Sequence, residues 1–187
     1  YNCIDVSNYT GFSEILDGRV KTLHPVIYGG ILGRQDVADH RRQMLEHGIE
    51  EIGVVAVNLY PFVTTVSDPD VSLSEALENI DIGGPAMIRA AAKNFPNVIV
   101  IVDPIDYGWV GSRISSGEKI ALDERRELAR KAFQHVAMYD TAISTWLNEG
   151  TYIEPKELTV GLQKMEDLRY GENPHQAGAV YQTVLGN

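Results

Sequence analysis

IGVVAV at residues 52–57 and VIVIV at residues 98–102 are two continuous apolar runs. Neither run alternates with polar residues, and both are rich in β-branched side chains. Runs of this length and composition are typical of strands buried on both faces of a parallel sheet. Helical patterns lie between and after these runs, so the sequence predicts an α/β domain with a parallel sheet.

Capping and stop signals mark the helices between the two strands. A polar helix over residues 39–46 is expected to end at Gly48. Ser72 and Glu75 match a capping box at the start of another helix. Residues 85–94 are predicted as a helix that carries Pro at its first position.

Two further helices are expected after the second strand. Asp103 and Pro104 open a short helical stretch, and residues 122–148 form the longest helix, which Gly150 ends. One buried face of this long helix is predicted from the spacing of its apolar residues. Those residues are Leu128, Ala132, Val136, Ile143 and Leu147.

The chain is expected to contain only part of its sheet. Residues 3–6 are predicted as a third strand, but a doubly wound sheet usually has about four to six strands. We therefore expect further strands to be supplied upstream of Tyr1 or by another chain. A boundary is expected at residues 151–155, so that residues 1–150 form one domain and residues 151–187 a linker and the start of a second.

Charge and cysteine content exclude several classes of protein. The 187 residues include 16 Lys and Arg against 26 Asp and Glu, a net charge of −10, which argues against a nucleic-acid-binding module. The single cysteine, Cys3, excludes an internal disulfide and is expected to be buried and inert. No apolar run approaches the ~20 residues of a membrane helix, and no signal peptide is recognised. We expect a cytoplasmic protein without a membrane partner.

One polar cluster lies well before the first strand in the sequence, and another directly follows that strand. Arg19 and Lys21 lie in RVKTLHP at residues 19–25 and would suit a phosphate or a developing oxyanion, although spacing alone favours a solvated loop. Asn58 and Tyr60 directly follow the first strand, where ligands of open α/β sheets bind. The alternative, equally weighted, is that the Tyr60 ring packs beneath its loop.

Two more clusters belong to the helix before the second strand. Asp81 and the Gly83-Gly84 pair precede it, so a ligand could approach the backbone there; the alternative is that Asp81 only caps the helix. Arg89 and Lys93 are four residues apart and share a face. A solvated face is the usual explanation for such a pair, but the alanines between them favour an anion. The histidines show no metal-ligand spacing, so no metal site is expected.

Five segments together resemble one enzyme family, in its order and at plausible spacings. They are RVKTLHP (19–25), NLYPF (58–62), IDIGG (80–84), RAAAKN (89–94) and LRYGENPHQ (168–176). The first four are similar to the inosine monophosphate cyclohydrolase domain of the bifunctional enzymes of purine biosynthesis. The fifth is similar to the opening of their aminoimidazole carboxamide ribonucleotide transformylase domain.

The resemblance implies a methylglyoxal-synthase-like, three-layer α/β domain, incomplete at its N-terminus. It implies dehydrative ring closure of 5-formamidoimidazole-4-carboxamide ribonucleotide to inosine monophosphate, a reaction that needs no cofactor. The downstream transformylase domain would use 10-formyltetrahydrofolate as cosubstrate. The intact protein is expected to be a homodimer whose ligands are purine nucleotides.

The resemblance also assigns roles to residues. Lys93 is the implied proton donor and acceptor, and Lys21, Tyr60 and Asp81 line the reacting groups. Their side-chain chemistry fits these roles. Lys21 and Tyr60 can donate hydrogen bonds to an oxyanion, and Asp81 can accept a proton. Nucleotide contacts are implied for Arg19, Thr22, Asn58, Ile82 and Gly83, and contacts with the transformylase substrate for Arg169 and Tyr170.

One departure from the family affects the expected activity. The family's Ser-Thr-Gly-Gly-Thr phosphate loop does not occur in this sequence, so we expect the chain alone to be inactive even if a longer protein is active. The main alternative is a non-catalytic regulatory domain of the same fold that binds a phosphate or nucleotide. The acid–base set argues against it. A third possibility, an assembly module, depends only on the long helix.

Overall fold

The computed structural model describes residues 2–148 and 156–185. The chain divides into two compact units, each with its own interior. The sheet unit comprises Tyr1–Leu59 with Asp81–Val136, and the hairpin unit comprises Tyr60–Ile80 with Ala137–Asn187. The longest helix, α8 (Leu122–Leu147), contributes residues to both.

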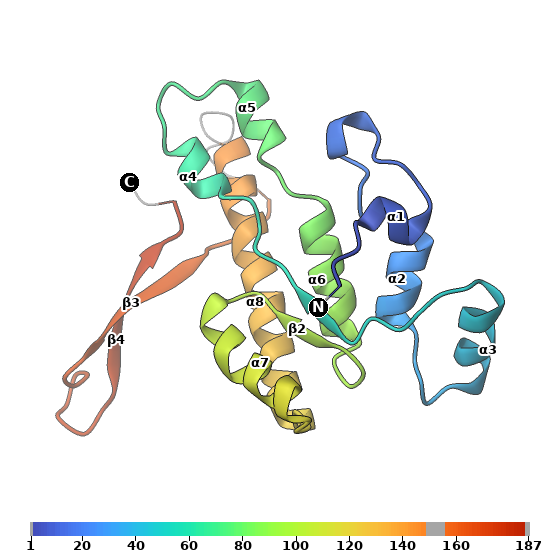
Figure 1. The fold of residues 1–187 in the computed structure, drawn as a ribbon. Coiled ribbons are helices and arrows are strands. Elements are labelled where there is room, and N and C mark those ends of the chain that lie inside the picture. Colours follow the sequence, from blue (N-terminus) through green and yellow to red (C-terminus); the bar gives the residue numbers. More distant parts are fainter. Residues whose placement is uncertain (1, 149–155, 186–187) are drawn as a thin grey trace. The chain divides into compact units, whose positions relative to one another are not determined.

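The described elements follow one another as Figure 1 shows. The sheet unit contains α1 (Val6–Thr10), η1 (Leu16–Gly18), α2 (Pro25–Leu32), α3 (Ala38–Glu46), β1 (Val54–Ala56), α6 (Gly83–Lys93), β2 (Ile99–Ile101), η2 (Pro104–Asp106), α7 (Tyr107–Ser116) and the first part of α8. The hairpin unit contains α4 (Phe62–Val66), α5 (Leu73–Glu78), the end of α8, β3 (Leu162–Leu168) and β4 (Gly178–Thr183). None of the described helices is both long enough and apolar enough to cross a membrane.

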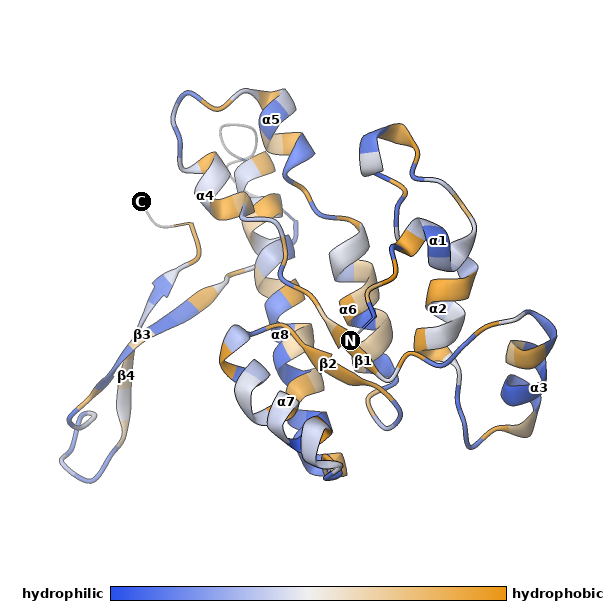
Figure 2. Cartoon of the chain, viewed as in Figure 1, coloured by the Kyte–Doolittle hydropathy of each residue, from blue (hydrophilic) through white to orange (hydrophobic). Residues whose placement is uncertain are grey.

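The two apolar runs form strands that pair in parallel, as predicted. Val55 lies opposite Val100, and the hydrophobic character of both strands is visible in Figure 2. All three residues of β2 are buried, which confirms burial on both faces for this strand. The same prediction is wrong for β1, because Val54 and Ala56 point to the face opposite Val55 and are exposed among the described residues.

Helix α6 is the centre of the sheet unit. It packs against β1, β2 and α2, and its buried face consists mainly of small residues. Ile88 and Ala91 are fully buried on that face. The helix begins at Gly83, two residues earlier than predicted, so Pro85 is its third residue rather than its first. Proline is tolerated there because N–H groups of the first turn have no acceptor within the helix.

A buried asparagine joins the end of α6 to the end of α2. Asn94 is 6% exposed, and its Nδ2 donates to the carbonyl oxygens of Ile31 (2.8 Å) and Gly33 (3.0 Å). Its Oδ1 accepts a hydrogen bond from Asn97 Nδ2 at 2.9 Å. Carbonyls at a helix end lack intrahelical donors, so Asn94 supplies the donors that the end of α2 needs.

The start of the chain differs from the prediction. Residues 3–6 do not form a strand: the backbone of Asp5 is extended, and α1 begins at Val6. The backbone N–H of Tyr9 donates to the Asp5 carbonyl and closes the first helical turn. No described strand pairs with this segment, so its β-branched residues have no sheet to join. Cys3 is exposed, contrary to expectation.

The residues that are buried on α8 follow the helical period more closely than the residues predicted to be buried. Leu128, Ala132 and Val136 are buried as expected, but the face then continues through Tyr139 and Ala142. Of the remaining predicted residues, Ile143 is half-buried and Leu147 is 54% exposed. Leu147 is 19 residues after Leu128, which at about 100° per residue turns it about 100° away from the face that Leu128 marks. Gly150 and the predicted boundary at residues 151–155 lie outside the described residues.

Local signals predicted several helix ends correctly. Ser72 and Glu75 form the capping box of α5. Asp103 caps η2 by accepting from the backbone N–H of Ile105 at 3.0 Å. Gly48 lies just after α3 with a positive φ of 61°, which suits a glycine at a helix stop.

The hairpin unit has an aromatic cluster and an antiparallel pair of strands. Phe62 meets the rings of Tyr139 and Trp146 edge to face, with centroids 6.3 and 5.7 Å away. The Tyr139 hydroxyl donates to the Asn79 carbonyl at 3.1 Å. Strands β3 and β4 pair antiparallel with a shift in register after Lys164. This hairpin was not predicted, because its strands carry many polar residues and show no continuous apolar run.

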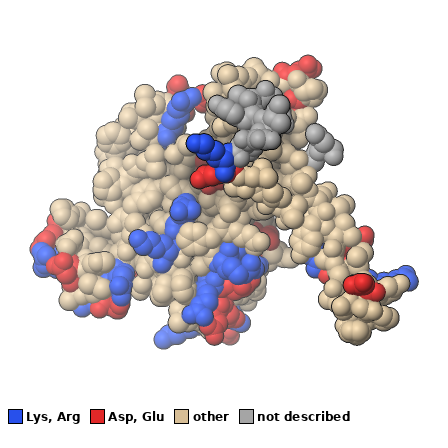
Figure 3. Space-filling model, turned by 180° about the vertical axis from the view of Figure 1, so that it is seen from behind, with Lys and Arg blue, Asp and Glu red and all other residues tan. Residues whose placement is uncertain are grey.

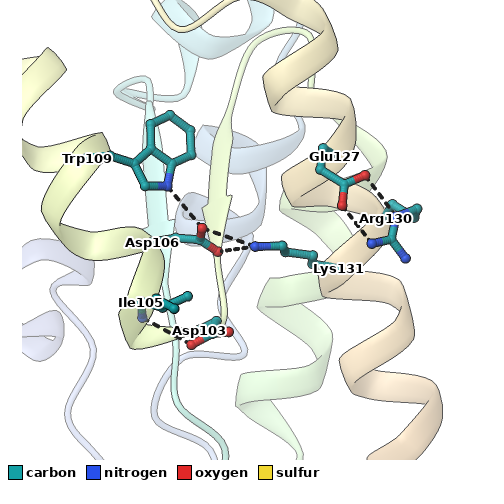
Figure 4. A network of polar contacts seen from close by, with 7 residues as sticks. All are labelled: Asp103, Ile105, Asp106, Trp109, Glu127, Arg130 and Lys131. Atoms are coloured by element: carbon teal, nitrogen blue, oxygen red, sulfur yellow. Dashed lines mark hydrogen bonds and ion pairs between the residues drawn. The ribbon is translucent and has the colours of Figure 1, made fainter. Parts of the chain in front are cut away.

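A buried carboxylate ties η2 and α7 to α8 within the sheet unit (Figure 4). Asp106 is 5% exposed and accepts from Trp109 Nε1 and Lys131 Nζ, each at 2.9 Å. A buried charge needs a partner of opposite sign. Lys131 therefore compensates for a carboxylate that would otherwise be unpaired.

We expect Lys131→Met to lower the free energy of unfolding by about 2 kcal/mol, because it leaves the buried charge of Asp106 without its cation. Urea denaturation followed by circular dichroism measures this. The double variant with Asp106→Asn should recover much of the loss. Equal stability of the single variant and the parent would contradict the assignment.

Asn94→Ala should also cost about 2 kcal/mol, because it leaves the Ile31 and Gly33 carbonyls without donors. Asn97→Ala is the matched control and removes only one bond, so about 1 kcal/mol or less is expected. The same urea titration compares the two. If both variants lose the same amount, Asn94 does not join α2 to α6 in the way described.

Candidate active site at the start of helix α6

Two glycines allow three segments of the sheet unit to meet at the start of α6. A Cβ added at Gly83 would lie 2.5 Å from Thr22 Oγ1, and one at Gly84 would lie 2.8 Å from Leu59 Cδ2. Both distances are too short for a side chain unless its neighbours move. We call this place the α6 edge and define it by Thr22, Leu59, Asp81, Gly83 and Gly84.

Asp81 is fixed at the α6 edge by a backbone hydrogen bond. Its Oδ1 accepts from the N–H of Gly84 at 2.7 Å, and the residue is half-buried. The capping alternative is therefore confirmed as a contact. Capping uses Oδ1, and a carboxylate has further acceptor positions on both oxygens. The same contact that caps the helix thus also orients Asp81.

The loop that carries Arg19 and Lys21 has an unusual backbone. Leu16, Asp17 and Gly18 have successive positive φ angles of 55°, 53° and 88°. Non-glycine residues rarely adopt this conformation, and such strain is found preferentially at functional sites. The strained turn lies directly before Arg19, so it sets the direction in which the RVKTLHP segment leaves.

An ion pair holds Lys21 in this loop. Its Nζ lies 3.2 Å from Glu14 Oε2, and both side chains are about half exposed. A Cβ at Gly18 would lie 2.6 Å from Glu14 Oε1, so the glycine leaves room for this carboxylate. Lys21 directly precedes Thr22 of the α6 edge. Sequence reasoning missed Glu14, because nothing in its spacing from Lys21 indicates the contact.

Asn58 and Ile82 flank the α6 edge in sequence. Asn58 is exposed after β1, and its Oδ1 accepts from the Tyr107 hydroxyl at 2.6 Å. Ile82 precedes the first residue of α6 and is 59% exposed. Both residues are exposed, and the nucleotide contacts that the resemblance implies for them stay a prediction.

The remaining predicted residues of these motifs lie in the hairpin unit. Tyr60 is 56% exposed, so its ring is not packed beneath the loop. Arg169 and Tyr170 directly follow β3, in the turn of the hairpin, and both are exposed. The backbone N–H of Gly171 donates to the Gln176 carbonyl at 2.7 Å and closes this turn.

Lys93 lies at the other end of α6. It is the tenth residue after Gly83, which corresponds to about 15 Å along a helix. Lys93 and Arg89 share a face, as predicted, and both line a cavity away from the α6 edge. The structure therefore brings Thr22, Asp81 and Gly83 together, with Lys21 adjacent in sequence, and leaves Lys93 apart from them.

The potential metal ligands of the described segments do not gather into one site. Residues 2–148 and 156–185 hold no cluster of three or more His, Cys, Asp or Glu side chains placed to bind a metal. His24 has a structural role, because its Nδ1 accepts from the backbone N–H of Val26 at 3.2 Å and caps α2.

Known proteins match nearly the whole chain. The profile of the MGS-like domain family matches residues 1–86, which confirms the expected fold class, and that of the AICARFT/IMPCHase bienzyme family matches residues 91–187. The bifunctional purine biosynthesis protein PurH of Lysinibacillus sphaericus is 53% identical over 182 residues, and that of Bacillus subtilis 52% over 183. Each alignment covers 97% of this chain.

The chain spans about a third of the length of these relatives, 35% and 36%. Among solved structures, the crystal structure of ForH matches with a TM-score of 0.67 and 36% identity. That match covers 76% of this chain and 74% of ForH. On the family profile and these identities, the chain belongs to the AICARFT/IMPCHase bienzyme family.

Proposed function

We propose that this chain carries the inosine monophosphate cyclohydrolase part of a bifunctional enzyme of purine biosynthesis. The substrate would be 5-formamidoimidazole-4-carboxamide ribonucleotide, and the products inosine monophosphate and water. Family membership supports the reaction. The observation that carries the site is the meeting of Thr22, Asp81 and Gly83 at the α6 edge, beside Lys21.

The proposed chemistry needs orientation more than strong acids or bases. The carboxamide nitrogen is a poor nucleophile, so holding it against the formyl carbon would supply much of the rate. Attack forms the new C–N bond and places negative charge on the formyl oxygen, which later leaves as water. Lys21 would stabilise that charge, and Asp81 would accept a proton from the attacking nitrogen.

The substrate would have to compete with Glu14 for Lys21. At 3.2 Å and about half exposure, the ion pair is accessible to solvent and weak enough for an anionic ligand to displace. Glu14 would then hold the ammonium group in place until the nucleotide arrives. Arg19, Asn58 and Ile82 are proposed to contact the nucleotide around the α6 edge.

Other roles depend on the family resemblance alone. Tyr60 is proposed as a second donor to the formyl oxygen, and Lys93 as the proton donor and acceptor. In the longer protein, Arg169 and Tyr170 would contact the transformylase substrate, with 10-formyltetrahydrofolate as cosubstrate. We further propose a cytoplasmic homodimer and a cyclisation step without a cofactor.

Lys21→Ala should lower kcat/KM for cyclisation by about 100-fold or more, because it removes a donor to the developing oxyanion. Ultraviolet absorbance follows the reaction, since ring closure changes the chromophore.

The assay uses this chain and a chimera in which it replaces the matching 182 residues of the Lysinibacillus sphaericus relative. Lys119→Ala is the control, because Lys119 is an exposed lysine before α8. Nucleotide binding without any product, in the chimera as well, would instead support the regulatory-domain alternative.

Lys93→Ala tests the role given by resemblance separately. If Lys93 transfers a proton, kcat should fall by about 100-fold, in the range of general acid–base catalysis. Such a transfer needs hydrogen-bond reach, so a fall of this size would mean that the bound nucleotide extends along α6 from the edge to Lys93. An undiminished kcat in the chimera would remove Lys93 from the mechanism and leave the assignment of Lys21 and Asp81 standing.

A further inference from the structure

A hydrogen bond joins the two segments that follow the parallel strands of the sheet unit. The Tyr107 hydroxyl donates to Asn58 Oδ1 at 2.6 Å, although 49 positions separate the two residues in sequence. Asn58 is the second residue after β1, and Tyr107 is the first residue of α7, which follows β2 through η2. Ligands of open α/β sheets bind outside the carboxyl ends of the strands. The contact therefore lies where a ligand of this sheet is expected.

The backbone that carries the Tyr107 hydroxyl is firmly held. The residue before it, Asp106, is the buried carboxylate that accepts from Trp109 and Lys131 (Figure 4). A tyrosine side chain has only two torsions, so little freedom remains between this backbone and the hydroxyl. The base from which Tyr107 reaches Asn58 is thus fixed by contacts that do not involve Asn58.

Asn58, by contrast, depends on Tyr107 for the orientation of its amide. Its side chain is exposed, and within residues 2–148 and 156–185 the Tyr107 hydroxyl is the only protein group to which this amide is hydrogen-bonded. Because the hydroxyl proton occupies Oδ1, both N–H groups of Nδ2 stay available as donors. Asn58 directly precedes Leu59 of the α6 edge. The contact therefore presents a hydrogen-bond donor, rather than an acceptor, beside that edge.

The pair is uncharged, which sets it apart from other groups that could attract a nucleotide. Charged side chains, such as those that Figure 3 shows on the face seen from behind, act on a ligand through forces that salt screens. A hydrogen bond between a hydroxyl and an amide carries no net charge to be screened. The effect of losing it should therefore be the same at low and at high salt.

We propose that Tyr107 is a positioning residue, which orients Asn58 Nδ2 to donate to an acceptor oxygen of the nucleotide. The proposal takes its ligand from the proposed function but does not depend on the cyclisation chemistry. Tyr107 lies in none of the five segments that resemble the family. It acts through Asn58 and does not touch the nucleotide. Loss of its hydroxyl therefore weakens binding of substrate and transition state alike, which raises KM and leaves kcat unchanged.

The test measures KM and kcat in the chimera with the Lysinibacillus sphaericus relative, and the dissociation constant of inosine monophosphate by calorimetry on the same protein. Tyr107→Phe removes only the hydroxyl, so KM and the dissociation constant should each rise about fivefold, the effect of one neutral hydrogen bond. This rise should not depend on salt, and kcat should stay within about twofold of the parent. Tyr181→Phe is the matched control and should behave like the parent, because Tyr181 is an exposed tyrosine on β4.

A double variant tests whether Tyr107 acts through Asn58. Asn58→Ala should weaken binding at least as much as Tyr107→Phe. Adding Tyr107→Phe to Asn58→Ala should have no further effect, because the hydroxyl then has no amide to orient. A further loss of about fivefold in the double variant would mean that Tyr107 contacts the nucleotide itself, and would overturn the positioning role.

Asn58→Asp tests which atom of the side chain faces the ligand. The carboxylate keeps an acceptor for the Tyr107 hydroxyl but has no N–H to donate, so it should bind no better than Asn58→Ala. Affinity equal to that of the parent would show that an oxygen faces the nucleotide, and would overturn the proposal. Thermal unfolding of each variant separates lost binding from lost folding.

Failure of this inference and failure of the proposed function give different results. A chimera that forms product with an unchanged KM after Tyr107→Phe overturns the inference and leaves the proposed function standing. A chimera that binds inosine monophosphate with the expected coupling between Tyr107 and Asn58, but forms no product, supports the inference and counts against the proposed cyclisation. Absence of any nucleotide binding would overturn both.

Discussion

Close packing of helix α6 is the constraint on which the rest of the sheet unit depends. Its buried face is built from glycine, alanine and one isoleucine, so its backbone can approach β1, β2 and α2 closely. Gly83 and Gly84 have no room for a Cβ against Thr22 and Leu59. At the other end, Asn94 replaces missing donors at the end of α2. Both ends of one helix are thus fixed by specific contacts.

Each fixed end of α6 organises a different group of polar residues. At the start, close packing brings Thr22 and Asp81 beside the loop that carries Lys21. At the end, the same helix presents Arg89 and Lys93 to the space between itself and α8. A rigid helix keeps Arg89 about 9 Å and Lys93 about 15 Å from Gly83 along its axis. The family motif IDIGG therefore leads into α6, whereas RAAAKN lies at the other end of the helix.

Local patterns predicted the features that depend on neighbouring residues in sequence. The parallel strands, the capping box at Ser72 and the shared face of Arg89 and Lys93 follow from spacing and periodicity. Residues 3–6 show where such patterns fail, because a short segment with β-branched residues becomes a strand only if another strand pairs with it. The exposed face of β1 has the same explanation, since burial on both faces requires a covering layer for each.

The site residues that sequence reasoning missed depend on contacts between distant segments. Glu14 meets Lys21 only because three successive residues adopt positive φ angles, and no residue in that turn except Gly18 signals it. The cavity lined by Tyr28, Arg89 and Arg126 forms where three helices converge, which no single periodicity encodes. The four cations in its lining belong to two ordinary i,i+4 pairs, one on α6 and one on α8, each of which alone is typical of a solvated face. Only the structure shows that both pairs line one space between α6 and α8.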